Sequence, residues 1–174
     1  IFLILLPFSF VNDSKSQELD ILFDKLSKVK DPYIASSLEK KIWAIWSKHP
    51  KNEKLTNKLE FGKNLMNEGS YNYALKVFSN IIKSDPKWSE AWNARATLLF
   101  YMKDYESSLS DIDKVLYLEP RHFGALSGRA QISIRLRDYE NAILDLKKVK
   151  ELIPTSNKSE LIKELTNLVK GLNI

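Results

Sequence analysis

The sequence predicts an all-α protein: a solenoid of three antiparallel helix pairs, preceded by an N-terminal helical hairpin and followed by a C-terminal capping helix. Three observations lead to this prediction. Prolines recur at intervals of 34 residues, at Pro86, Pro120 and Pro154. Tyrosines and small residues recur at the same interval. The apolar residues between them follow helical spacing.

The first segment, residues 1–16, is predicted to be a secretory signal peptide. It begins with the uncharged apolar run IFLILLPFSFV, and polar residues follow at once. Small residues at Ser14 and Ser16 predict cleavage after Ser16, and the initial Ile suggests a start truncated by a few residues. The mature chain would be periplasmic in a bacterium and would not span the membrane, since a transmembrane helix needs about 18 apolar residues. A short buried segment is the alternative.

Residues 17–50 are predicted to form a helical hairpin. Apolar residues at helical spacing indicate a first helix over residues 17–29 and a second over residues 32–48. Asp31 is placed to cap the second helix, and proline, as in Pro32, is favoured at the first helical position.

Three repeats of 34 residues follow, at residues 55–88, 89–122 and 123–156. They share two columns of small residues, two of large apolar residues, and a polar residue before the second helix. In repeat order these are Gly62, Ala96 and Ala130; Ala74, Ser108 and Ala142; Phe78, Ile112 and Leu146; Ile81, Val115 and Val149; and Ser70, Asp104 and Asp138. Small residues let two helices approach, and a larger side chain there would cost about 1–3 kcal/mol. The polar residues are expected to cap the second helices, and the prolines to end them.

Residues 157–174 are predicted to form the capping helix. Its apolar residues, among them Leu161, Leu165 and Leu168, share one face, and lysines lie on the other. Asn157 and Glu160 have the spacing of a capping box. A terminal helix with a polar outer face keeps a solenoid soluble.

The period and the residue types of the repeats resemble the tetratricopeptide repeat (TPR) family, whose repeats each contain two antiparallel helices, A and B. Trp92 stands at the tryptophan position of the family, whereas Lys58 and Leu126 replace it in the other two repeats. Arg95 and Arg129 occupy a position where leucine is usual. The stretches IWAIW and EPRHFGALSG narrow the resemblance to small exported bacterial TPR proteins.

The resemblance implies that the A helices line a concave groove that binds a peptide or a protein partner. The candidates carried over by position combine amides, a hydroxyl, an aromatic ring and two cations: Lys63, Asn67, Asn93, Thr97, Tyr101, Gln131 and Arg135. The amides would hold a peptide backbone, while Lys63 and Arg135 would hold an acidic group. A solvated face without a ligand is the alternative for each of them.

One specialisation of the family, the clamp for a C-terminal carboxylate in chaperone-binding TPR domains, is not expected here. That clamp uses lysine, arginine and asparagine side chains. The corresponding positions hold Leu59, Lys63, Ala94, Gly124 and Gly128. Because four of these five side chains offer a carboxylate neither charge nor a donor, a chaperone tail is not the expected partner.

The sequence offers no constellation for catalysis. It contains no cysteine, hence no thiolate metal site, and no HExxH, GxSxG or glycine-rich phosphate motif, so we expect neither enzyme activity nor a cofactor or metal. The two histidines are far apart, and His122 is expected to be an ordinary surface or turn residue between two repeats. The 27 basic and 22 acidic residues are spread along the chain, which predicts no nucleic-acid partner.

The predicted function is therefore that of a non-catalytic interaction module, an adaptor that binds its partner in the groove. The alternative is a structural or assembly protein that oligomerises through its convex face or its N-terminal hairpin. Trp43 and Trp46 share a helix face and are expected to pack against the neighbouring hairpin. The oligomeric state stays open.

Overall fold

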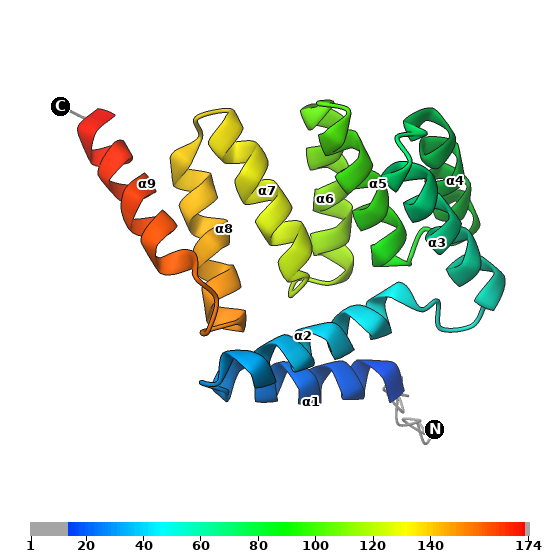
Figure 1. Cartoon of the computed structure of the whole chain (residues 1–174), viewed down its shortest axis with the longest axis horizontal. Coiled ribbons are helices and arrows are strands. Elements are labelled where there is room, and N and C mark those ends of the chain that lie inside the picture. Colours follow the sequence, from blue (N-terminus) through cyan, green and yellow to red (C-terminus); the bar gives the residue numbers. More distant parts are fainter. Residues whose placement is uncertain (1–13, 173–174) are drawn as a thin grey trace, which may run out of the picture.

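In the computed structural model, which describes residues 14–172, nine helices follow one another in antiparallel pairs (Figure 1). They are α1 (Ser14–Lys28), α2 (Pro32–Ser47), α3 (Glu53–Asn67), α4 (Tyr71–Ser84), α5 (Ser89–Tyr101), α6 (Tyr105–Leu118), α7 (Phe123–Arg135), α8 (Tyr139–Leu152) and α9 (Lys158–Leu172). The described residues contain no β-strand. The predicted all-α fold of antiparallel helix pairs is confirmed.

Most of the predicted signal peptide lies outside the described residues, so export stays a prediction. Ser14 and Ser16, which define the predicted cleavage site, lie in the first turn of α1. Within residues 14–172, every helix falls short of the length and hydrophobicity that a membrane span requires.

Each repeat is held together by a large apolar side chain of its B helix, which packs against a small residue of its A helix. Phe78 of α4 and Ile112 of α6 are buried in this way. Gly62 of α3 shows why the position must be small, because an added Cβ would come within 2.4 Å of the Phe78 ring. The predicted column of small residues is therefore a steric requirement of the helix pairing.

Three of the five predicted helix caps form. The carboxylates that accept backbone N–H groups are those of Asp31, Asp104 and Asp138. Ser70 makes no side-chain cap, and the N–H of Tyr73 bonds the backbone oxygen of Ser70. Asn157 and Glu160 form no capping box with each other, so that prediction is wrong as well.

The two arginines at the usual leucine position form equivalent ion pairs one repeat apart. Arg95 donates through Nε and Nη2 to the carboxylate of Asp111, at 2.7 and 2.8 Å. Arg129 donates in the same way to Asp145, at 2.8 and 2.9 Å. Hydrogen bonding to Asp145 raises the pKa of Arg129 above its ordinary value, so Arg129 stays protonated. The buried carboxylates explain how the fold accommodates two arginines near its core.

The N-terminal hairpin lies across the ends of the repeat helices instead of stacking parallel to them, as Figure 1 shows for α1 and α2. Its apolar face shares one core with the third repeat. The rings of Phe23 and Trp46 lie 6.4 and 5.0 Å from that of Phe123, at the start of α7. Arg121 adds an ion pair with Asp20 of α1 at 2.7 Å. The hairpin is therefore an integral part of the folded core.

Two expectations about this junction are wrong. His122 lies in the turn before α7, as expected, but it is no surface residue: it is fully buried, and its ring stacks on that of Trp46 with centroids 4.1 Å apart. Trp43 packs edge-on against His122 and Phe123, at 5.3 and 5.5 Å. The tryptophans thus pack mainly against the third repeat and not against the neighbouring one. This contact joins segments far apart in the chain, which helical periodicity does not report.

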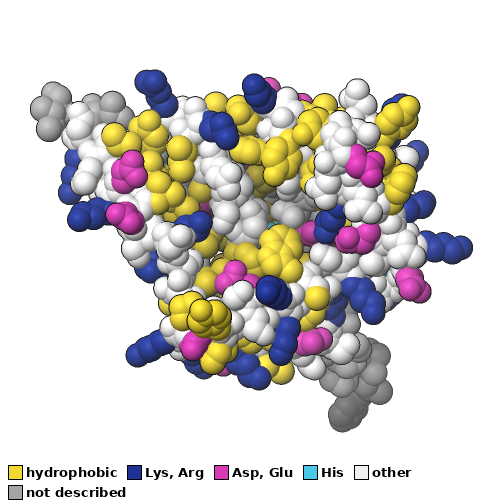
Figure 2. Space-filling view, in the orientation of Figure 1, with side chains coloured by type: hydrophobic (Ala, Val, Ile, Leu, Met, Phe, Trp, Pro, Cys, Tyr) yellow, Lys and Arg dark blue, Asp and Glu magenta, His cyan; other side chains and the backbone are white. Residues whose placement is uncertain are grey.

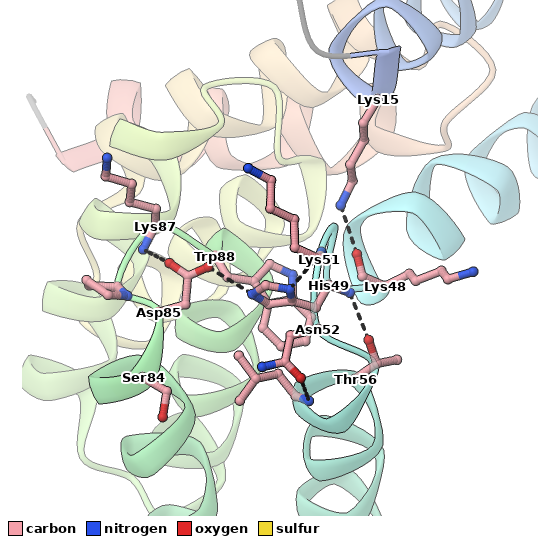
Figure 3. Close-up of polar contacts among 12 residues, drawn as sticks. Lys15, Lys48, His49, Lys51, Asn52, Thr56, Ser84, Asp85, Lys87 and Trp88 are labelled. Atoms are coloured by element: carbon pink, nitrogen blue, oxygen red, sulfur yellow. Dashed lines mark hydrogen bonds and ion pairs between the residues drawn. The ribbon is translucent and has the colours of Figure 1, made fainter.

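A second set of contacts fastens the end of α2 and the turn after it to the first repeat, and Figure 3 shows the contacts around His49 and Asp85. His49 Nε2 lies 2.8 Å from Asp85 Oδ2, and the N–H of Lys87 donates to the other carboxylate oxygen at 2.9 Å. The indole N–H of Trp88 donates to the backbone oxygen of Trp46 at 2.9 Å. The hairpin is consequently held at both the first and the third repeat.

Candidate binding groove

The A helices α3, α5 and α7 line a groove that contains two adjoining pockets. The pocket between α3 and α5, the α3–α5 pocket, has a volume of about 360 Å³. The pocket between α5 and α7, the α5–α7 pocket, has a volume of about 170 Å³. Asn93 and Thr97 of α5 line both, so the two pockets adjoin along α5. Figure 2 shows the molecule hollowed at its centre, between the hairpin and the repeat helices.

A buried carboxylate organises the α3–α5 pocket. Glu90, at the start of α5, is only 1% exposed. Lys63 Nζ lies 3.2 Å from Glu90 Oε1, Asn93 Nδ2 donates to Oε2 at 3.0 Å, and His122 Nε2 lies 3.3 Å from Oε2. Lys63 also lies 3.5 Å from Glu60. A buried carboxylate such as that of Glu90 requires such compensation, and Lys63 provides the positive charge. The charge of Lys63 is therefore already neutralised inside the protein.

The helix α2 closes this side of the groove. Trp43 lines the α3–α5 pocket, and its ring lies so close to Gly124 that an added Cβ there would come within 2.6 Å. His122 caps α7 by accepting the N–H of Ala125 at Nδ1, which leaves Nε2 as the donor toward Glu90. The wall of the groove, the cap of α7 and the network around Glu90 are therefore parts of one packed unit.

The α5–α7 pocket has an apolar base. Ala96, Ile112 and Ile132 line it and are buried. Gly128 of α7 faces the same space, and the atom nearest to an added Cβ there is Ile112 Cδ1 at 3.7 Å. The lack of a side chain at Gly128 thus contributes directly to the open volume.

The mouth of the same pocket is polar and partly unpaired. Asn93 uses its Nδ2 for Glu90, while its Oδ1 accepts no hydrogen bond from the described residues. The amide of Gln131 is exposed and likewise makes no hydrogen bond within residues 14–172. Tyr101 adds an exposed ring. These groups can bond the N–H and C=O groups of an extended peptide.

Arg135, near the end of α7, differs from Lys63. Its Cζ lies 5.0 Å from the centroid of Phe100, a ring that lines the α5–α7 pocket. The guanidinium is exposed and pairs with no carboxylate of the described chain. Of the two predicted groove cations, Arg135 therefore keeps its charge available to a ligand.

The predicted groove residues lie on one surface in three groups. Asn93, Thr97, Tyr101 and Gln131 line the α5–α7 pocket, Lys63 and Asn67 line the α3–α5 pocket, and Arg135 stands over Phe100. Their roles in binding stay predictions. Among residues 14–172, no cluster of acidic residues and histidines is placed to hold a metal ion.

Sequence reasoning missed the residues that shape this groove. The glycines Gly124 and Gly128 are four apart in one helix and therefore share a face, a spacing that could have indicated a close approach or a pocket. From the sequence, the two glycines indicated only the lack of cations at the positions of the chaperone clamp. No local signal marked the burial of Glu90 or the wall formed by Trp43, since both depend on contacts between distant segments.

Comparison with known families and relatives agrees with this architecture. The family described as tetratricopeptide repeat matches residues 89–122 and 124–156. A TPR repeat-containing protein of Rhizobium etli is 34% identical over 104 residues, which make up 60% of this chain and 50% of the relative. The chain thus spans about half the length of the curated relative that it matches.

Solved structures share the fold at lower identity. The first TPR of Spaghetti (RPAP3), bound to the HSP90 peptide SRMEEVD, has a TM-score of 0.64 and 22% identity, covering 70% of this chain and 98% of that one. The Yersinia enterocolitica type III secretion chaperone SycD, in complex with a peptide of the translocator YopD, has a TM-score of 0.58 and 16% identity, covering 72% and 97%. At these identities the similarity shows the fold alone.

Proposed function

We propose that this chain, a tetratricopeptide-repeat protein, is a non-catalytic adaptor that binds a peptide or an extended segment of a protein partner in the groove of α3, α5 and α7. The observation that carries the proposal is the α5–α7 pocket. It combines an apolar base with the unpaired Oδ1 of Asn93 and the unpaired amide of Gln131 at its mouth. Peptide recognition uses this combination, because side chains enter pockets while the backbone needs hydrogen-bond partners.

The similar structures support the same class of ligand. The RPAP3 domain is bound to an HSP90 peptide, and SycD is in complex with a peptide of YopD. For this chain we propose a different peptide chemistry from that of the HSP90 tail. Leu59 is fully buried and Ala94 nearly so, and Gly124 and Gly128 provide no cation.

A variant that fills the groove tests the proposal. Thr97 lines both pockets, and Thr97→Trp would place a large ring across them. Ser110→Trp introduces the same residue at an exposed position of α6 and serves as the matched control. The full chain and both variants are used to capture partners from a lysate of the source organism, and each captured protein is then purified and its affinity measured directly.

We expect a partner that binds the unmodified chain and the Ser110→Trp variant but not Thr97→Trp. A partner that Ser110→Trp loses and Thr97→Trp keeps would contradict groove binding. That result would favour the alternative function, an assembly protein that acts through its convex face. Light scattering separates the two further, since a stable dimer that survives Thr97→Trp is expected only from the assembly protein.

We also propose that the chain is exported to the periplasm of a bacterium. The apolar run IFLILLPFSFV, followed at once by polar residues, supports this proposal. Mass spectrometry of the N-terminus of the protein from fractionated cells tests it. Export predicts a periplasmic protein that begins at Gln17, and a cytoplasmic protein that retains the apolar run would contradict it.

A further inference from the structure

We infer that the α5–α7 pocket receives one uncharged apolar side chain of the bound peptide, while Arg135 pairs with an acidic group close to that side chain in the peptide. The inference rests on the proposed function and names its ligand class: a segment in which an aliphatic or phenyl side chain stands beside a carboxylate. It also assigns Gly128 as the residue that determines the size of the accepted side chain.

The volume of the pocket suits a single side chain. It measures about 170 Å³, and an engineered apolar cavity of roughly 150 Å³ in another protein binds benzene. A leucine, isoleucine or phenylalanine side chain, whose bulk is close to that of benzene, therefore fits this space.

The base of the pocket favours an apolar occupant. Its one hydroxyl, that of Ser108, donates to the backbone oxygen of Ala96 at 2.8 Å and is fully buried. The other groups at the base, such as Ile112 and Ile132, are hydrocarbon. A charged side chain would lose its hydrogen bonds to water at this base without replacement, which is unfavourable.

Charge complementarity defines the neighbour of that side chain. Lys63 is neutralised by Glu90, so Arg135 carries the available positive charge among the seven predicted groove residues. Its guanidinium stands over Phe100, which is itself a wall of the pocket. Since an extended peptide advances about 3.3 Å per residue, a carboxylate within two residues of the apolar side chain lies within reach.

The two glycines of α7 occupy their positions for different reasons. Gly124 is required by the fold, because a Cβ would collide with Trp43 at 2.6 Å. Gly128 is not required, because its nearest neighbour would be Ile112 Cδ1 at the ordinary contact distance of 3.7 Å. Glycine inside a helix is unfavourable relative to alanine, so the fold alone does not explain Gly128. A pocket that must stay open for a ligand does explain it.

A phage-displayed library of random peptides, selected on the immobilised full chain, tests the inference. We expect the selected peptides to share an aliphatic or phenyl residue with an acidic residue beside it. Their affinities are then measured on four variants. Gly128→Leu fills the pocket, Gly128→Ala fills it in part, and Arg135→Gln removes the charge. Gly171→Leu repeats the glycine-to-leucine change in α9, where nothing lies within 4 Å, and is the matched control.

The expected result is a loss of roughly tenfold or more with Gly128→Leu, a smaller loss with Gly128→Ala, and no change with Gly171→Leu. Arg135→Gln should weaken acidic peptides several-fold and leave peptides without an acidic residue unaffected. Thermal melts check folding, and Gly128→Ala decides the question if Gly128→Leu is unfolded. Peptides that bind in the groove but tolerate both Gly128 variants would overturn this inference and leave the proposed function standing. A selection that yields no peptide at all would overturn the proposed function itself.

Discussion

The two halves of the groove use polar residues in opposite ways. In the α3–α5 half, Lys63, Asn93 and His122 all converge on Glu90, so the polar groups satisfy one another and stabilise the fold. In the α5–α7 half, Gln131 makes no hydrogen bond and Arg135 no ion pair within the described residues; Gln131 lines the pocket, and Arg135 stands over Phe100 at its wall. A polar residue on the concave face is therefore no indication of ligand binding until its partners are known.

The largest expected effect on the free energy of unfolding follows from the network around Glu90 in the α3–α5 half of the groove. Replacing Glu90 by alanine would leave Lys63 and His122 facing a buried space without their carboxylate. We expect a loss of about 3 kcal/mol in the free energy of unfolding, the lower end for a broken buried pair because Lys63 can turn toward water. Urea denaturation measures it.

Glu60→Ala is the control for that variant, since Glu60 also lies near Lys63 but is exposed. Exposed pairs contribute little, so this variant should stay within about 0.5 kcal/mol of the unmodified chain. Equal losses for the two variants would mean that the network around Glu90 does not stabilise the fold.

The ion pair of Arg129 and Asp145, outside the groove, gives a second measure of what a buried pair contributes to stability. Phe61 and Val77 stand in the first repeat at the positions of Arg129 and Asp145 in the third. Asp145→Val alone should cost about 2–3 kcal/mol, because it leaves Arg129 without its buried carboxylate. Adding Arg129→Phe copies the first repeat and should recover most of that loss in urea denaturation. A double variant as unstable as the single one would show that the ion pair has a role beyond mutual compensation.

Two of the helical glycines that face neighbouring helices, Gly62 and Gly128, should respond to alanine with opposite signs. Gly62→Ala forces the buried ring of Phe78 to move, and we expect a net loss of about 1 kcal/mol after the gain in helix propensity. Gly128→Ala meets only Ile112 at contact distance and should raise stability by about 0.5–1 kcal/mol. Melting curves of the two variants check the signs. A destabilised Gly128→Ala variant would show that the fold, and not a ligand, requires this glycine.

The smallest effect concerns the salt dependence of binding. Arg135 is exposed, so its pairing with an acidic peptide should contribute only about 0.2–1 kcal/mol and should weaken as salt is added. Fluorescence anisotropy of one selected acidic peptide, at low and high salt, measures this on the unmodified chain and on Arg135→Gln. The two proteins should differ at low salt and converge at high salt, and a constant difference would exclude a screened ion pair.

The repeat period was sufficient to predict the fold. The same core position is filled in successive repeats by Phe78, Ile112 and Leu146, because each repeat packs its two helices in the same way. A local pattern of this kind can be recognised in the sequence. The caps were partly predictable. Asp104 and Asp138 form them, whereas at Ser70 the backbone takes over the bond.

The groove was predictable only as a surface. Position along the A helices placed Lys63 and Arg135 on the concave side, but nothing in the sequence separated a neutralised cation from an available one. That distinction depends on the burial of Glu90 and on the packing of Trp43 against Gly124. Both arise from the docking of the hairpin across the repeats, a contact between segments that no periodicity connects.

The central claim, that ligands bind in the groove of α3, α5 and α7, is tested most directly by nuclear magnetic resonance. The nitrogen-15-labelled chain is titrated with a peptide selected on it, and shifts are followed for every amide. Binding in this groove predicts shifts of the side-chain amides of Asn93 and Gln131, of backbone amides of α5 and α7 around the pocket, and of Ser108 and Ile112 of α6 at its base, while α8 stays unchanged. Shifts confined to α6 and α8, or to the outer face of the hairpin, would contradict it.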